Sequence, residues 1–142
     1  MKNKKSFYNL ILMLKSTFDE KIYTKTLEIG LTMGQPMILE CLMQNNNIIQ
    51  KDIAKYCKKK ETTIGLILRG MEKSGLVQKE KCNNDKRCVY ISITKKGKEK
   101  ALKMKKIYEE VEKDIASCLD EEEKNDFENY LKRMINENLE VI

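Results

Sequence analysis

Apolar residues recur every three or four positions through residues 6–28, which predicts one amphipathic helix. The members of this stripe are Phe7, Ile11, Leu14, Phe18 and Ile22. Ser6 is the expected N-cap, and Gly30 is expected to stop the helix. So wide a stripe needs a covering surface, which either a second subunit or the chain's own core would provide.

The segment LTMGQPMILECLMQ predicts a second helix. Thr32 is its expected N-cap, with Gln35 at the capping-box position and Pro36 in the first turn. Residues 45–47 are three asparagines, which predict a turn, and Ile48 is expected to pair with a later strand. The inward-facing positions are expected to be Ile38, Leu39 and Leu42.

Residues 50–57 and 61–74 predict two short helices joined by a turn of three lysines, residues 58–60. Gly75 is the expected C-cap of the second helix. Residues 76–82 and 88–94 follow as strands, since apolar and polar positions alternate in the second of them. Turn-forming and basic residues lie between the strands, which predicts a β-hairpin.

Thr94 is the expected N-cap of a long helix that reaches about Cys118. Asp120 then opens a last helix whose first turn is acidic, which favours the positive end of the helix dipole. The order of elements predicts a mainly α (α+β) fold over residues 1–142: a helix-turn-helix with a β-hairpin wing, flanked by helices at both ends.

Charge is concentrated in the middle of the chain. Residues 50–98 hold 14 Lys and Arg against five Asp and Glu, whereas the remaining residues hold 14 and 17. An excess of nine positive charges in one segment favours binding to phosphates.

Composition limits the other classes of function. No apolar run approaches the ~20 residues of a membrane span, and charged residues interrupt the apolar N-terminal patch, so we expect a cytoplasmic protein without membrane contact. The chain has no His, no CxxC motif and no glycine-rich phosphate loop. We therefore expect no enzyme activity, no metal site and no cofactor.

Five cysteines are widely spaced in a chain without export features, so a disulfide framework is not expected. Cys82 and Cys88 flank the hairpin tip and would lie near each other across the strands. Reduced, inert thiols and a redox switch are the two alternatives for them.

Several segments, in order and at the right spacing, resemble the MarR family of transcriptional regulators along essentially the whole chain. They are LTMGQPMILECL, QKDIAKYC, GMEKSGLV and NNDKRCVYISITKKG. The resemblance implies a homodimer in which residues 1–30 and 98–142 form the dimerisation helices and residues 31–97 the DNA-binding region. It also implies a repressor or activator that binds double-stranded DNA and is released by a small-molecule effector or an oxidant.

The second helix of the motif would then enter the major groove, and the wing would reach the minor groove. In the wing, Arg87 matches the family's minor-groove arginine and Asp85 the acid that orients it. The full set of expected DNA contacts is Gln50, Lys51, Lys60, Thr62, Thr63, Gly65, Leu66, Arg69, Lys79, Lys81, Asp85, Lys86 and Arg87, with Lys58 and Lys59 as further phosphate contacts.

Each assignment has a plainer alternative. Thr62 and Thr63 would also serve as helix caps, and the lysines as a solvated loop. Four positions depart from the family pattern: Ile49, Lys60, Leu66 and Gly70. Because of these departures, we expect the wing and the backbone contacts to contribute more to DNA binding than the second helix of the motif, the recognition helix. A ligand cleft would be lined by Phe7, Ile11, Met37, Cys41 and Tyr108, for which ordinary core packing is the alternative.

The function expected from the sequence is a DNA-binding transcriptional regulator, a repressor acting as a homodimer on a pseudo-palindromic operator. The alternatives are a winged-helix adaptor whose basic face meets an acidic protein, and a thiol-based redox-responsive regulator. The first helix has no cysteine, so the peroxide-sensing mechanism of some relatives does not carry over.

Overall fold

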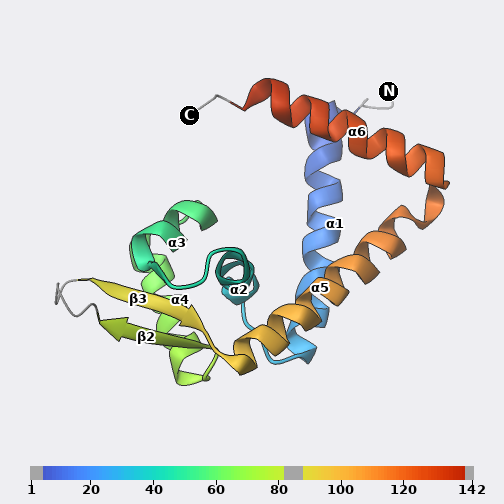
Figure 1. Ribbon diagram of the computed structural model, residues 1–142. Coiled ribbons are helices and arrows are strands. Elements are labelled where there is room, and N and C mark those ends of the chain that lie inside the picture. Colours follow the sequence, from blue (N-terminus) through green and yellow to red (C-terminus); the bar gives the residue numbers. More distant parts are fainter. Residues whose placement is uncertain (1–4, 82–87, 140–142) are drawn as a thin grey trace.

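Three helices and a small sheet pack together at one end of the molecule, and three longer helical segments extend from them (Figure 1). The computed structural model describes residues 5–81 and 88–139. Its elements are α1 (Phe7–Glu28), α2 (Gln35–Gln44), β1 (Ile48–Ile49), α3 (Gln50–Cys57), α4 (Glu61–Lys73), β2 (Val77–Lys81), β3 (Val89–Ile93), α5 (Lys95–Ile115), a 3₁₀ turn (Ala116–Cys118) and α6 (Glu121–Asn138). This is the winged helix with flanking helices that the sequence predicts.

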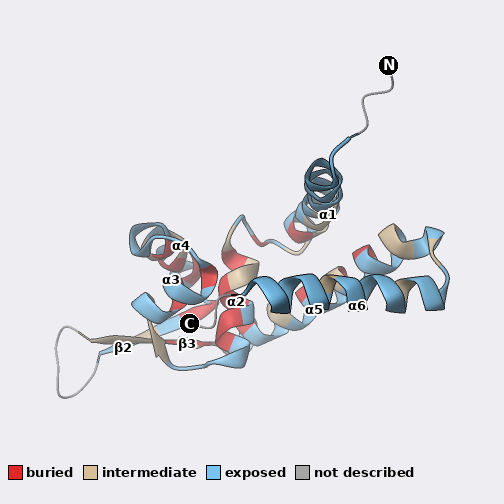
Figure 2. Cartoon of the chain, turned by 90° about the horizontal axis from the view of Figure 1, so that it is seen from above, coloured by how far each residue is buried: buried red, intermediate tan, exposed pale blue. Residues whose placement is uncertain are grey.

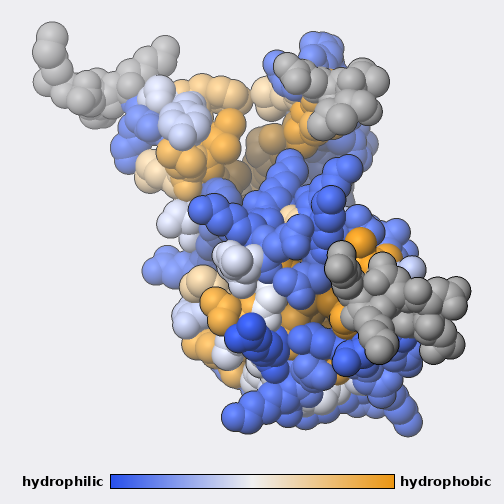
Figure 3. All heavy atoms as spheres, turned by 90° about the vertical axis from the view of Figure 1, so that its left-hand side faces the viewer, coloured by the Kyte–Doolittle hydropathy of each residue, from blue (hydrophilic) through white to orange (hydrophobic). Residues whose placement is uncertain are grey.

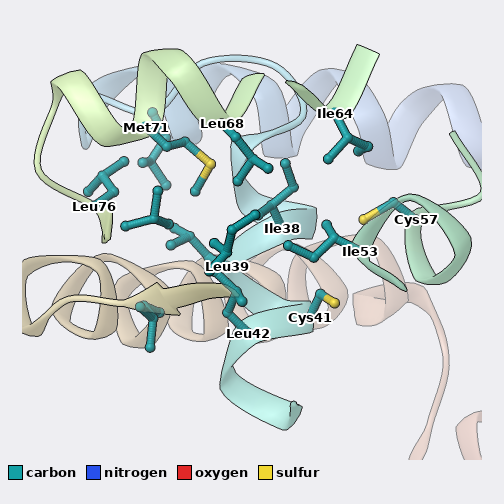
Figure 4. Packing of buried hydrophobic residues seen from close by; sticks show 14 of the residues in the cluster. Ile38, Leu39, Cys41, Leu42, Ile53, Cys57, Ile64, Leu68, Met71 and Leu76 are labelled. Atoms are coloured by element: carbon teal, nitrogen blue, oxygen red, sulfur yellow. The ribbon is translucent and has the colours of Figure 1, made fainter. Parts of the chain in front are cut away.

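The core lies between α2, α3 and α4. Ile38, Leu39 and Leu42 project from α2 toward Ile64 and Leu68 of α4, and all five are fully buried (Figure 4). The inward face predicted for α2 is therefore confirmed. Burying a side chain of this size stabilises a fold by roughly 1.5–3 kcal/mol, so this cluster fixes the position of α4 against α2.

A three-stranded antiparallel sheet, in the order β1-β3-β2, closes one side of this core. Ile48 pairs with Ile91, as the sequence predicts for Ile48. Two asparagines of the turn before β1 also bond to β3. The Ile93 amide donates to Asn46 Oδ1 at 3.0 Å, and Ser92 Oγ donates to Asn47 Oδ1 at 3.2 Å. The hairpin is thus tied to the segment that enters the helix-turn-helix.

The long helices α1 and α5 meet through ion pairs as well as apolar contacts. Lys21 Nζ lies 2.6 Å from Asp114 Oδ2, and Lys25 Nζ lies 3.1 Å from Glu110 Oε2. Most of α1 and α6 is nevertheless exposed, whereas buried residues gather in the winged helix (Figure 2). The first half of the apolar stripe of α1 is therefore not covered within one chain, since Phe7 is 64% exposed and Ile11 43%, whereas Phe18 and Ile22 pack against the core.

Three predicted caps are confirmed. Ser6 Oγ accepts from the Asn9 amide, Thr94 Oγ1 accepts from the Gly97 amide, and Asp120 forms a full capping box with Glu123.

Some predicted helix ends are wrong. α2 begins at Gln35 with Gly34, at φ +85°, as its N-cap, so the prediction of Thr32 as N-cap is wrong. The capping-box contact predicted for Gln35 is present, since Gln35 Oε1 accepts from the Thr32 amide at 3.0 Å. α5 ends at Ile115, and residues 116–118 tighten into a 3₁₀ turn. The C-cap of α4 is Ser74, with Gly75 at φ +76° one position later.

Candidate nucleic-acid interface

The turn between α3 and α4 presents three consecutive lysines, residues 58–60, and all three are exposed. Lys58 ends α3 in the left-handed conformation, at φ 51°. The Lys59 amide then bonds to the Ala54 carbonyl at 3.0 Å, which closes the end of the helix. Ile53 and Ala54 anchor α3 in the core, so the lysines are held on the outside of a tight, buried turn.

The first turn of α4 is open to an acceptor from outside. Among the described residues, Lys60 occupies the N-cap position without a side-chain capping bond. Thr62 and Thr63 are exposed beside these backbone N–H groups. A helix N-terminus with unpaired N–H groups and positive dipole attracts anions such as phosphate.

Gln50 has a different place from the one predicted for it. Its Nε2 donates to the Glu61 carbonyl at 2.9 Å and lies against Gly65, so this side chain joins the two helices of the motif. Both Gln50 and Gly65 are only partly exposed. In this geometry the two residues set the distance between α3 and α4, and neither projects freely from the surface.

The exposed side of α4 carries few polar groups. Thr62, Thr63, Arg69 and Gly70 are exposed there, and Leu66 is 67% exposed. Seen from the winged-helix end, the surface is mainly hydrophilic with separate apolar patches (Figure 3).

The described part of the wing begins with β2 and resumes at Cys88. Lys81 is exposed at the end of β2. Lys79 is instead half-buried and pairs with Glu72 of α4 at 3.3 Å, so part of its charge is already compensated. Asp85, Lys86 and Arg87, together with Cys82, lie outside the described residues.

The other described lysines of the basic segment form no ion pair that would compensate their charge. Among the described residues of 50–98, Lys79 is the one that forms an ion pair within 4.0 Å. Lys51 is exposed on α3. Lys55 is exposed one turn after it, at the i+4 spacing that puts both on one face, a signal that the prediction from the sequence missed.

The predicted ligand residues are not all brought together. Met37 and Tyr108 line a cavity of about 560 Å³ between α1, α2 and α5. Burial raises the pKa of the Tyr108 hydroxyl, and the charge of Glu40 adds to the effect. Phe7 and Ile11 lie on the exposed first half of α1, and Cys41 is fully buried in the core, so a lining shared by all five residues is wrong.

Two of the cysteines are held as unreactive thiols. Burial, with smaller contributions from Cys57, Asp52 and Glu40, raises the pKa of Cys41 to about 11. Burial likewise raises the pKa of Cys57. A thiol that stays protonated is a poor nucleophile and a poor target for oxidants. Cys118 is exposed in the 3₁₀ turn.

Within residues 5–81 and 88–139, no cluster of three or more potential ligands is placed to hold a metal ion. None of the helices in the same ranges combines the length and apolarity that a bilayer crossing requires.

Comparisons with known proteins agree with this geometry. Residues 31–89 match the model of the MarR family. The Staphylococcus aureus MepR–DNA complex is 25% identical, with 94% of this chain and 99% of that chain covered and a TM-score of 0.78. The transcriptional regulator SlyA is 25% identical, covering 94% of each chain at a TM-score of 0.78. MarR is 22% identical, covering 96% of this chain and 93% of that chain at a TM-score of 0.83. A search of curated proteins found no match.

Proposed function

We propose that this chain, whose residues 31–89 match the MarR family model, is a winged-helix DNA-binding repressor of that family that acts as a homodimer. In this proposal residues 31–97 bind DNA, and residues 1–30 and 98–142 dimerise. The two copies bind a pseudo-palindromic duplex whose half-sites lie about one helical turn, ~10 bp, apart.

The observation that carries the proposal is the exposed first turn of α4, which lies beside lysines that form no ion pair among the described residues. The open N–H groups of the first turn, Thr62 and Thr63, and the turn of residues 58–60 all lie at this point of the fold. Together they offer hydrogen bonds and positive charge to a phosphate backbone while α4 meets the base edges. MepR, which has a similar fold, has been crystallised in complex with DNA, and this supports DNA binding by the fold.

Dimerisation is supported by apolar side chains that one chain leaves exposed. On α1 and α6 these are Phe7, Tyr8, Leu10, Ile11, Leu12, Met13, Leu14, Phe127, Tyr130, Met134, Ile135 and Leu139. A cavity of about 680 Å³ between α5 and α6, with Phe18 of α1 on its wall, offers a seat for helices of a partner. Apolar surface of this extent marks a protein interface.

A small effector would bind in the cavity that Met37 and Tyr108 line. This cavity lies between α1, α2 and α5, so a ligand bound in it would change the orientation of the DNA-binding region relative to the dimerisation helices. Release of DNA follows if the ligand binds better to the arrangement in which the two α4 helices no longer match the half-site spacing.

DNA binding is tested by fluorescence anisotropy with duplex DNA from upstream of the protein's own coding sequence. The affinity is expected to fall on the order of 10³-fold or more from 50 to 200 mM salt. Arg87→Ala is expected to weaken binding while leaving the circular dichroism and the dimer unchanged. No salt-sensitive, competitor-resistant complex would favour an adaptor that binds an acidic protein.

Light scattering after gel filtration tests the dimer. The wild type is expected to elute with twice the chain mass, and Ile135→Glu, on the exposed face of α6, to shift toward the monomer. Met43→Glu changes an exposed apolar residue of α2 (45%, against 55% for Ile135) that lies outside both dimerisation segments, and it serves as the control. A monomeric wild type at working concentration would overturn the homodimer.

A further inference from the structure

Leu66 is the one large apolar side chain that α4, which lies wholly within the described residues, leaves exposed, at 67%. Residues three or four positions away share its face of the helix. These neighbours are Thr62, Thr63, Arg69 and Gly70, all of them exposed. Leu66 therefore lies at the middle of the surface that would face the major groove.

The chemistry of this face limits which bases it can read. Residues 62–70 contain no Asn, Gln, Asp or Glu. Within this stretch the paired amide contact to adenine is therefore missing, the nearest carboxylate is Glu61 at the first position of α4, and Arg69 is the one side chain suited to a paired contact with guanine. What remains is apolar: the leucine and the threonine methyl groups match the C5-methyl group of thymine, which only the major groove displays.

Gly70, one turn after Leu66, adds no side chain to this face of α4. A Cβ there would make an ordinary contact with the Gln35 amide, 3.8 Å away. Gly65, just before Leu66, is packed against Gln50. The leucine is thus the large apolar side chain of a face that it shares with Thr62, Thr63 and Arg69, and the two glycines beside it add no bulk that would hold a base edge away.

We propose that Leu66 reads thymine methyl groups, so that each half-site of the operator carries thymine where the middle of α4 meets the major groove. The inference rests on the proposed function, since it names the bases that the proposed DNA contact selects. It makes an apolar contact, and not a hydrogen bond, the main source of sequence preference in this helix.

The test compares thymine with uracil, which lacks the C5-methyl group and keeps the same pairing edge and minor-groove face. Duplexes are first enriched from a random pool by the wild-type protein, and the best duplex is then made with uracil at one thymine at a time. Uracil at the contacted position is expected to weaken binding about fourfold, the transfer value of one methylene-sized group, and roughly 15-fold when both half-sites are changed.

Leu66→Ala separates this contact from general effects of uracil on the duplex. The variant is expected to fold, because the side chain is exposed and alanine favours helices. It should bind the thymine duplex more weakly and lose the uracil effect, whereas Leu102→Ala should keep both the affinity and the effect.

A wild-type protein that binds thymine and uracil duplexes equally overturns the role of Leu66 and leaves DNA binding itself intact. The same conclusion follows if Leu66→Ala retains the full uracil effect. If the wild type enriches no duplex and forms no salt-sensitive complex, the proposed function fails, and the reading of thymine fails with it.

Discussion

The Gln50 side chain lies so close to Gly65 that a Cβ added at Gly65 would come within 2.9 Å of the Gln50 amide nitrogen. The same nitrogen donates to the Glu61 carbonyl at 2.9 Å. One hydrogen bond therefore spans from the first residue of α3 to the first residue of α4, and it needs a glycine one turn into α4. The two helices of the motif are spaced by this contact as well as by their apolar core.

Gly65→Ala should change the free energy of unfolding by no more than about 1 kcal/mol. Alanine gains about 1 kcal/mol in helix propensity, while displacement of the Gln50 amide breaks a hydrogen bond worth roughly 0.5–1.5 kcal/mol. The decisive measurement is a double-mutant cycle by urea denaturation: Gln50→Ala should destabilise the wild type and have little effect in Gly65→Ala. Equal effects in both backgrounds would show that the two residues are not coupled.

Gly97 is the glycine at which a side chain is least tolerable. A Cβ there would lie 2.2 Å from the Leu76 carbonyl oxygen and 2.7 Å from Ile93 Cγ1. Since the first neighbour is backbone, Gly97→Ala should cost about 2 kcal/mol or more in thermal or urea unfolding. Gly70→Ala, where a Cβ would make only an ordinary contact of 3.8 Å with the Gln35 amide, should instead be neutral or stabilise by up to about 1 kcal/mol. Equal stability of the two variants would contradict this difference.

The sequence was sufficient for the elements whose signals are local. Periodicity and caps predicted the helices and strands in order, and Ser6, Thr94 and Asp120 are caps as expected. The start of α2 was predicted too early: the Gln35 side chain accepts from the Thr32 amide as in a capping box, but Gly34, with its left-handed backbone, is the N-cap and the helix begins at Gln35. A local pattern does not show whether the helix begins after Thr32 or at Gln35, because this depends on how α2 packs in the core.

The candidate site was less predictable because its details depend on contacts between distant residues. Lys79 was expected to face phosphate, but the register of β2 sets it against Glu72. Cys41 could line a cleft or pack in the core, and the structure shows the second, since the packing of α2 buries it fully. Charge predicts which segment faces DNA, whereas the role of each side chain depends on neighbours that the sequence does not place.

Asp114 should make the stability of the α1–α5 contact depend on pH. The Lys21 ammonium, through a hydrogen bond and its charge, lowers the pKa of the Asp114 carboxyl. A lowered folded-state pKa contributes stability above the unfolded value, and that stability is lost as the pH falls through the folded value. Both side chains are exposed, so the effect is small and weakens with salt.

Urea denaturation between pH 6 and pH 3 at low ionic strength checks this. Asp114→Asn should be less stable than the wild type at pH 6, and the difference should begin to narrow as the pH falls below the unfolded value of about 4. Glu109→Gln, which changes a neighbouring exposed carboxylate that forms no ion pair among the described residues, is the control. A constant difference across the pH range would show that the Lys21–Asp114 pair does not contribute through its charge.

The turn lysines should determine how steeply DNA binding depends on salt. Lys59 and Lys60 are exposed beside the open N-terminus of α4 and form no ion pair among the described residues. If both bind phosphate in each subunit, the double Lys59→Ala, Lys60→Ala variant leaves about four fewer phosphates neutralised per dimer. The slope of log K against log salt should then fall by about 0.9 for each of these phosphates.

Lys58 is left unchanged because its backbone is left-handed, so a substitution there could change the stability of the turn as well as the charge. Lys132→Ala, on the acidic α6, removes a positive charge far from the turn and should leave the slope unaltered. The loss of affinity should be similar on the enriched duplex and on random DNA, because phosphate contacts carry no sequence information. An unchanged slope, or a weakening confined to the enriched duplex, would remove these lysines from the backbone contacts and leave the wing and α4 to hold the DNA.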